Sequence, residues 1–255
     1  MVRFWSTSRD NSSPQWTRST LIVPAVSIGN VGQLAVDLLV NTLKCERVGI
    51  LESQYVLPCV GNHGAYGSTE DPKGHIAVEL ELYVCAGGDV YIIQQRSPVA
   101  TGCQRHFAED FMDWVKHCGF QNVLLLASID SAFRKDLQIL GPQLRYVCPG
   151  GADDRCVGMG LQELGADEGS DGIAESDRRS SPWPLLKASK DRGLPLTALC
   201  MFASEGDNIP DAIHVASAAS QLLALVPESD QAAFQWKPPS SWCNLYGPPS
   251  EAPMY

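Results

Sequence analysis

The feature that most constrains the fold is a strand, a turn and a helix in close succession near the end of the chain. Residues 194–203 form an apolar run of the length expected for a strand buried in a sheet. Gly206, Asp207 and Asn208 predict a turn, and Pro210 suits the first turn of a helix because it has no N–H to lose there. Apolar residues at helical spacing then continue to about residue 226. A strand that leads directly into such a helix indicates an α/β fold.

The same alternation of strands and helices extends over most of the chain. Residues 31–43 carry one apolar helical stripe, and a second stripe at residues 107–118 ends before Gly119, a residue suited to closing a helix. Further strands are predicted at residues 21–26, 47–51, 78–84, 90–94, 123–127 and 143–147, the third and fourth forming a hairpin. We therefore expect an α/β layered sandwich, with a mixed, largely parallel sheet flanked by helices.

The polar segments set the expected domain organisation. Residues 1–18 are polar and are expected to be flexible, and residues 19–247 are expected to form one α/β domain. Residues 151–182 interrupt the apolar pattern with eight carboxylates against three arginines, which predicts an acidic, disordered insertion. Residues 248–255 form a proline-bearing tail.

Composition narrows the classes of function. A net charge of −10 argues against a nucleic-acid-binding surface, which needs clustered lysine and arginine, and leaves a basic protein partner open. No apolar run approaches the length that spans a bilayer, and the first residues do not resemble a signal peptide. The nine cysteines are scattered without Cys-x-x-Cys spacing, which favours buried thiols in a reducing compartment over a disulfide framework or a zinc site.

One turn resembles a phosphate-binding loop in part. Gly29 and Gly32 lie between a predicted strand and a predicted helix, and helix N-termini attract anions. The turn lacks the Lys-Ser/Thr pair of a P-loop and the third glycine of a dinucleotide fingerprint. Tight turning and close packing of the helix on the strand explain the glycines as well, and we favour that structural interpretation.

Other candidate catalytic groups form no recognisable set. Ser27 and Ser204 lie outside a nucleophile elbow, and His214, the candidate base, falls on a predicted helix where a structural role is commoner. Glu205, Asp207 and Asp211 could hold a cation, but they do not follow the spacing of a calcium loop. Helix capping accounts for these carboxylates without an ion, so we predict neither enzymatic activity nor a cofactor or metal.

The end of the chain is rich in aromatic residues and prolines. Trp236 is expected to pack in the core, whereas Trp242, Leu245 and Tyr246 form a candidate partner interface because aromatic residues are common anchors at interfaces. The flanking prolines keep the segment extended and reduce the entropy lost on docking. Packing of both tryptophans on their own domain is the alternative.

Five blocks of sequence point together to one family. They lie at residues 21–39, 60–62, 136–138, 204–212 and 236–242. In content and order these blocks resemble the proteasome assembly chaperone family, over about residues 21–247. Residues 151–181 match none of them.

The resemblance implies a scaffold without enzymatic activity or cofactor. Its expected partner is proteasome assembly chaperone 1, in an obligate heterodimer. That dimer is expected to bind proteasome α subunits, to promote assembly of the α ring of the 20S core particle and to prevent off-pathway α-ring dimers. The implied fold is an α/β sandwich, and the implied location is cytosol and nucleus.

The final two residues, Met254 and Tyr255, resemble part of a docking motif. In proteasome activators and some assembly chaperones, a terminal hydrophobic–tyrosine–any-residue motif docks between α subunits. Here the third member is missing, which displaces the carboxylate by about 3.3 Å in an extended chain. An unengaged tail is the alternative.

Two other functions compete with the scaffold. One is a small α/β nucleotide- or phosphate-binding enzyme that uses the turn at Gly29 and Gly32, which a bound nucleotide would favour. The other is a degenerate enzyme fold reused as a homodimeric binding module, which the mass of the purified chain with and without its partner would distinguish.

Overall fold

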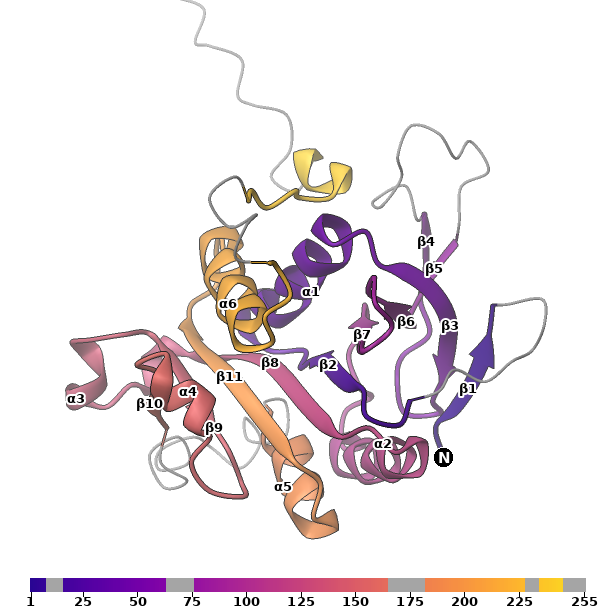
Figure 1. Cartoon of the computed structure of the whole chain (residues 1–255), viewed down its shortest axis with the longest axis horizontal. Helices are drawn as coiled ribbons and strands as arrows, with labels where there is room; N and C mark the ends of the chain where they lie inside the picture. Colours follow the sequence, from indigo (N-terminus) through magenta and orange to yellow (C-terminus); the bar gives the residue numbers. More distant parts are fainter. Residues whose placement is uncertain (8–15, 63–75, 165–181, 228–233, 245–255) are drawn as a thin grey trace, which may run out of the picture.

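One large mixed sheet organises the protein. The computed structural model describes residues 1–7, 16–62, 76–164, 182–227 and 234–244 (Figure 1). The sheet has nine strands in the order β1-β3-β6-β7-β2-β8-β11-β9-β10. Their bounds are β1 Arg3–Ser6, β2 Thr20–Pro24, β3 Glu46–Glu52, β6 Leu80–Val84, β7 Val90–Gln95, β8 Asn122–Asp130, β9 Leu144–Val147, β10 Gln162–Glu163 and β11 Leu196–Ala203. A separate two-stranded sheet pairs β4 (Val60–Asn62) with β5 (Ile76–Val78).

The centre of the sheet is parallel and its flanks are mixed. Strand β2 pairs in parallel with β7 on one side and β8 on the other, and β8 pairs in parallel with β11. Antiparallel pairs follow on both sides, from β7 to β6, β3 and β1, and from β11 to β9. The fold is therefore the predicted single α/β domain with a mixed sheet, and the sheet is parallel in its centre.

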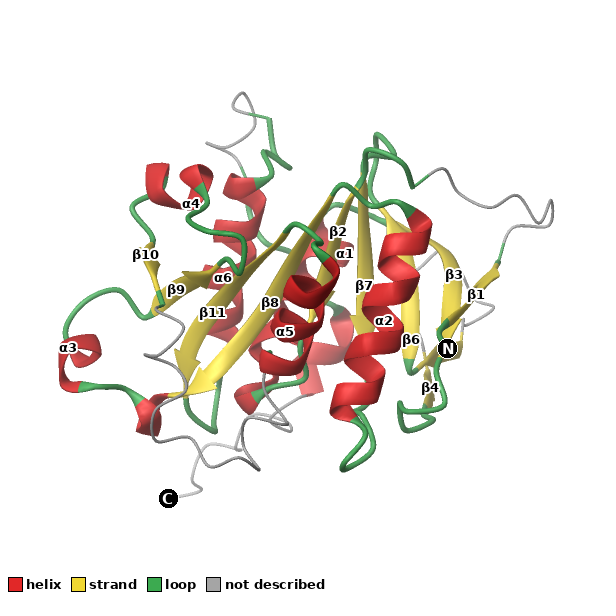
Figure 2. Ribbon diagram, turned by 90° about the horizontal axis from the view of Figure 1, so that it is seen from below, coloured by secondary structure: helices red, strands yellow, loops and turns green. Residues whose placement is uncertain are grey.

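Helices cover both faces of this sheet. Helices α1 (Val31–Thr42) and α6 (Ile209–Leu222) pack together on one face, and α2 (Gln104–Cys118) and α5 (Trp183–Arg192) pack on the other (Figures 1 and 2). All eight residues of β11 are buried, and successive side chains alternate between the two hydrophobic clusters. Burial on both faces explains why the sequence of this strand is apolar throughout.

The predicted helix at residues 107–118 and the predicted hairpin are confirmed. Helix α2 ends at Gly119, whose φ of 79° is left-handed and whose N–H bonds the carbonyls of Val115 and Lys116. Strands β6 and β7 form an antiparallel hairpin across Gly87 and Gly88, both with positive φ. The predicted strand at residues 78–84 is divided, because Val78 belongs to β5.

The prediction of a flexible N-terminus is wrong for the part that the structure describes. Residues Arg3–Ser6 form β1, which pairs antiparallel with β3 at the edge of the sheet. Trp16 is 9 % exposed and packs edge-on against Phe4, with ring centroids 5.1 Å apart. Residues 8–15 lie outside the described residues. Four residues of β1 are too few to show a period, so the polar composition concealed the strand.

The start of the predicted acidic insertion is also part of the fold. Helix α4 (Asp154–Gly158) buries Cys156, and β10 pairs in parallel with β9. Leu164 is 1 % exposed in the core beneath the α2/α5 face. The prediction of disorder is therefore wrong for residues 154–164, and residues 165–181 lie outside the described residues.

We predict that Asp153 stabilises this segment in a pH-dependent way. Its carboxylate accepts hydrogen bonds from the Arg155 side chain and from Thr197 Oγ1 (2.7 Å) on β11, and it caps α4 through the Arg155 N–H. These bonds, chiefly the one from Arg155, lower the pKa of Asp153 to about 2. Asp153→Asn should lower the free energy of unfolding at neutral pH by about 1 kcal/mol.

The pH profile supplies the control for this prediction. An aspartate in the unfolded chain has a pKa of about 3.9, so the contribution is complete above about pH 4 and disappears as the pH falls through about 2. Denaturant unfolding of both proteins between these limits should show the difference shrinking towards acid. A difference that stays constant would contradict the assignment.

Candidate functional site

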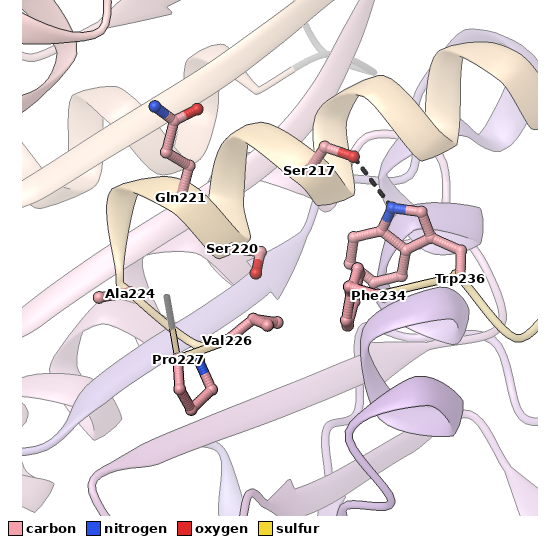
Figure 3. A pocket seen from close by; sticks show the side chains of 8 residues that line it. All are labelled: Ser217, Ser220, Gln221, Ala224, Val226, Pro227, Phe234 and Trp236. Carbon is pink, nitrogen blue, oxygen red and sulfur yellow. Dashed lines mark hydrogen bonds between the residues drawn. The ribbon is translucent and has the colours of Figure 1, made fainter. Parts of the chain in front are cut away.

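The C-terminal segment forms a strap across the helices of one face. This strap consists of residues 234–244, which pass over α6 and the end of α1 (Figure 1). Trp236 Nε1 donates a hydrogen bond to Ser217 Oγ on α6 at 2.9 Å, and its ring packs edge-on against Phe234 (Figure 3). Trp236 was expected to pack in the core. In the structure it is half-buried and packs against the edge of the core cluster.

Two hydrogen bonds join side chains of α1 to the backbone of the strap. Asn41 Nδ2 donates to the carbonyl of Lys237 at 2.6 Å, and the Lys237 N–H donates to Thr42 Oγ1 at 3.0 Å. Both helix residues lie in the last turn of α1. The strap is therefore fixed to α1 and α6, two helices that are far apart in the sequence.

The candidate interface residues separate into two groups. Trp242 lies in the short helix η5 (Ser240–Asn244) and is 8 % exposed, packed in the hydrophobic cluster that α1 and α6 share. The structure thus places Trp242 within its own domain, as in the alternative given above. Leu245, Tyr246, Met254 and Tyr255 lie outside the described residues. The position at which the chain reaches Asn244 is set by this anchored tryptophan.

A groove beside the strap was not predicted from the sequence. It has a volume of about 590 Å³ and is open to solvent, and it runs along the end of α6 (Figure 3). Its lining consists of Ser217, Ser220, Gln221, Ala224, Val226, Pro227, Phe234 and Trp236. Ser220 is buried and Ser217 is half-buried on α6, and no local sequence pattern indicates that the strap returns to meet them.

The turn at Gly29 and Gly32 is filled by the protein itself. Gly29 has a φ of 63°, and a Cβ there would lie 2.4 Å from Asn208 Nδ2. A Cβ on Gly32 would lie 2.3 Å from the carbonyl oxygen of Leu126 on β8. Asn208 is 3 % exposed and donates to the carbonyls of Ser204 and Gly206. The glycines therefore allow close packing, and this geometry does not favour a phosphate site.

The serines near this turn stabilise the backbone. Ser27 Oγ accepts the N–H of Ser128 at 2.9 Å and lies 2.8 Å from the Ser128 hydroxyl, which in turn donates to the carbonyl of Ile28. Ser204 shares a hydrogen bond with Ser131. His214 is exposed on α6 and bonds neither Ser27 nor Ser204. The structure does not bring these candidate residues together as a nucleophile and a base.

The carboxylates at the start of α6 act on the helix itself. Asp207 Oδ1 accepts the N–H of Ile209, the first residue of α6. Burial raises the pKa of Asp211, and the charge of Asp207 adds to that rise. Among the described residues, no group of three or more histidine, cysteine or acidic side chains is placed to hold a metal ion. Within the same residues, no helix combines the length and apolar character that crossing a bilayer requires.

We expect Gly29→Ala to destabilise the protein without any ligand being involved. The left-handed backbone and the contact with Asn208 should together cost about 1 to 2 kcal/mol of the free energy of unfolding. Removing the obstacle with Asn208→Ala should make the double variant less destabilised than the sum of the two single changes. Urea unfolding of all four proteins measures this coupling. Strict additivity would contradict the packing explanation of the glycine.

The chain is similar to known proteins along most of its length. The model of the PAC2 family matches residues 21–230. Proteasome assembly chaperone 2 of Danio rerio is 32% identical over 250 residues, covering 94% of this chain and 96% of that protein. The Homo sapiens protein of the same name is also 32% identical, over 253 residues, covering 92% of this chain and 94% of its own.

Solved structures share the fold at much lower identity. PbaA of Pyrococcus furiosus, an archaeal homologue of proteasome-assembly chaperone, has a TM-score of 0.64 at 16% identity, covering 91% of this chain and 90% of that chain. PbaB of the same organism, an archaeal proteasome activator, has a TM-score of 0.57 at 16% identity, covering 91% and 93%. The match of the family model over most of the sequence and the near end-to-end relatives show that this chain belongs to the PAC2 family, the family of the proteasome assembly chaperones.

Proposed function

We propose that this chain is one subunit of a heterodimeric chaperone for proteasome assembly. Its partner is proteasome assembly chaperone 1, and the dimer binds proteasome α subunits in cytosol and nucleus. It promotes formation of the α ring of the 20S core particle and prevents off-pathway dimers of α rings. The observation that carries this proposal is the likeness, over more than nine tenths of the chain, to relatives named proteasome assembly chaperone 2.

The features of the candidate site are consistent with a scaffold that works by binding. The turn that an enzyme would use is occupied by Asn208, and the nearby serines are engaged with the backbone. Function in a scaffold resides in preformed surfaces, and this domain is built around two hydrophobic clusters, one on each face of its sheet. We therefore assign no reaction to the chain.

The strap supports a role for the tail in α-subunit binding. Trp236, Lys237 and Trp242 hold the chain at the α1/α6 face up to Asn244, so the residues that follow start from a fixed point. Tethering a short binding segment to a folded dimer raises its effective concentration at a second site. We propose that Met254 and Tyr255 contribute a weak contact to α subunits, in addition to the contact made by the domain.

Co-expression tests the two parts of this proposal separately. The chain should co-purify with proteasome assembly chaperone 1 in equal amounts, and the complex should retain recombinant α subunits. Tyr255→Ala should weaken retention of α subunits several-fold and leave the heterodimer intact. Glu251→Ala is the matched control in the same tail and should have no effect. Equal retention by both variants would overturn the tail contact, and a homodimer as the main species would overturn the heterodimer.

A further inference from the structure

Two cysteines at the ends of neighbouring strands lie in contact. Cys45 follows α1 and directly precedes β3, and Cys85 directly follows β6. Their sulfur atoms are 2.7 Å apart, well inside the separation of two sulfurs that merely touch. Cys85 is 8 % exposed and Cys45 is half-buried. The two residues are 40 positions apart in the sequence, so only the fold brings them together.

The backbone holds both cysteines in place. The Cys45 N–H donates to the carbonyl of Val40 at the end of α1, at 3.0 Å. The Cys85 N–H donates to the carbonyl of Val90 across the β6–β7 hairpin, at 2.9 Å. Each cysteine is therefore fixed by a bond to a different element, and the contact between them does not depend on a mobile loop.

The strand register allows a covalent bond. Glu46 of β3 is paired with Val84 of β6, so extending the antiparallel register by one residue places Cys45 opposite Cys85. Opposite residues in such a pair have Cα atoms about 4.5 or 5.5 Å apart. Both separations lie within the range that a disulfide bridges, about 4.4 to 6.8 Å.

We propose that Cys45 and Cys85 form a reversible disulfide when the protein meets an oxidised thiol pool. Glutathione disulfide is the oxidant. The Cys45 thiolate attacks one of its sulfurs, which forms a mixed disulfide and releases one glutathione thiolate. The Cys85 sulfur then attacks Cys45, which closes the protein disulfide and releases the second glutathione. The two cysteines lose two protons and two electrons, and one glutathione disulfide becomes two glutathiones.

Several described cysteines have raised pKa values, so the position of Cys45 beside Cys85, and not its acidity, distinguishes this pair. Burial raises the pKa of Cys118 and of Cys200 to about 12, so both remain protonated. The contact with Cys85 also raises the pKa of Cys45, which keeps the thiolate fraction small and makes the first step slow. A reaction of hours is expected, with closure strongly favoured once the mixed disulfide exists.

The disulfide would stiffen the base of the strap. Cys45 lies only a few residues beyond Asn41 and Thr42, which bind Lys237. A disulfide between residues 40 positions apart would lower the conformational entropy of the unfolded chain. We therefore expect the midpoint of thermal unfolding to rise by roughly 5 to 10 °C.

Thiol trapping of the full chain tests the proposal. The reduced protein is incubated for hours in buffer rich in glutathione disulfide, blocked with N-ethylmaleimide, digested with trypsin and analysed by mass spectrometry. We expect residues 45–47 linked to residues 74–96, a thermal shift in the intact protein, and reversal of both by dithiothreitol. Cys103→Ser should behave like the original chain, whereas Cys45→Ser and Cys85→Ser should show neither linkage nor shift.

Two results would overturn the proposal. One is a Cys45–Cys85 pair that stays reduced while half-buried cysteines such as Cys59 and Cys103 become glutathionylated. The other is a mixture of linkages in which this pair is no more frequent than others. Comparison of oxidised and reduced forms of the same unmodified chain keeps the test valid even if a serine variant folds poorly.

Discussion

Glu81→Gln should lower the free energy of unfolding by about 3 kcal/mol, because it removes a buried carboxylate that pairs with both Arg47 and Arg96. Glu81 on β6 is fully buried. Its carboxylate lies 2.7 Å from Arg47 on β3 and 3.1 Å from Arg96, which follows β7. Tyr83 adds a hydrogen bond at 3.1 Å, and burial together with the Glu81 charge raises the pKa of this tyrosine, so it stays a donor.

The matched control is an ion pair of similar length on the surface. Arg105 and Glu109 lie 2.8 Å apart on α2, with side chains 78% and 38% exposed. Glu109→Gln should cost less than about 0.5 kcal/mol, since exposed pairs gain little in water. Urea unfolding of both variants gives the comparison. Equal losses would show that the Glu81 carboxylate is not the charge that balances Arg47 and Arg96.

Trp242→Ala should cost about 3 kcal/mol and lower the midpoint of thermal unfolding by roughly 6 to 12 °C. The side chain is 8 % exposed and belongs to the hydrophobic cluster that includes buried residues of α1 and α6, so its removal leaves a cavity in that cluster. The loss should also loosen the end of the strap, which would then be held to the helices mainly through Trp236 and Lys237. Calorimetry of the purified chain measures the shift.

Trp5 provides the control for Trp242. It lies on the edge strand β1 and is 53 % exposed, with Nε1 bonded to Glu52. Trp5→Ala should cost less than about 1 kcal/mol. If Trp242→Ala were equally mild, the C-terminal segment would not be packed on its domain, and Trp242 would return as a candidate for the partner interface.

The parallel centre of the sheet was predictable because strands buried on both faces are apolar throughout their length. Strand β11 reads as an apolar run, and α2 repeats its apolar residues with helical spacing before Gly119. Such patterns depend only on neighbours in the chain. The class of fold and most central elements follow from them.

The edges of the fold were harder to predict because they are short and partly polar. Strands β1 and β10 have four and two residues, too few to show a period. The acidic composition of residues 151–182 concealed α4, whose stability depends on Asp153 reaching across to Thr197 on β11. Contacts of this kind join residues distant in sequence and leave no local pattern.

Some features of the candidate site were also predictable from local sequence, and others were not. The structural role of Gly29 and Gly32 was favoured from the missing motif residues, and the contact with Asn208 explains it. The groove on α6 and the pairing of Cys45 with Cys85 were not predicted, since each needs the tertiary arrangement of separate elements. The sequence allowed two interpretations of Trp242, and only its burial in the hydrophobic cluster of its own domain distinguishes them.

Affinity purification of the tagged chain from cells, followed by mass spectrometry, tests the proposed function most directly. We predict recovery of proteasome assembly chaperone 1 in amounts similar to the chain, together with proteasome α subunits and few mature β subunits. Recovery of the chain alone, or only as a homodimer, would contradict the account.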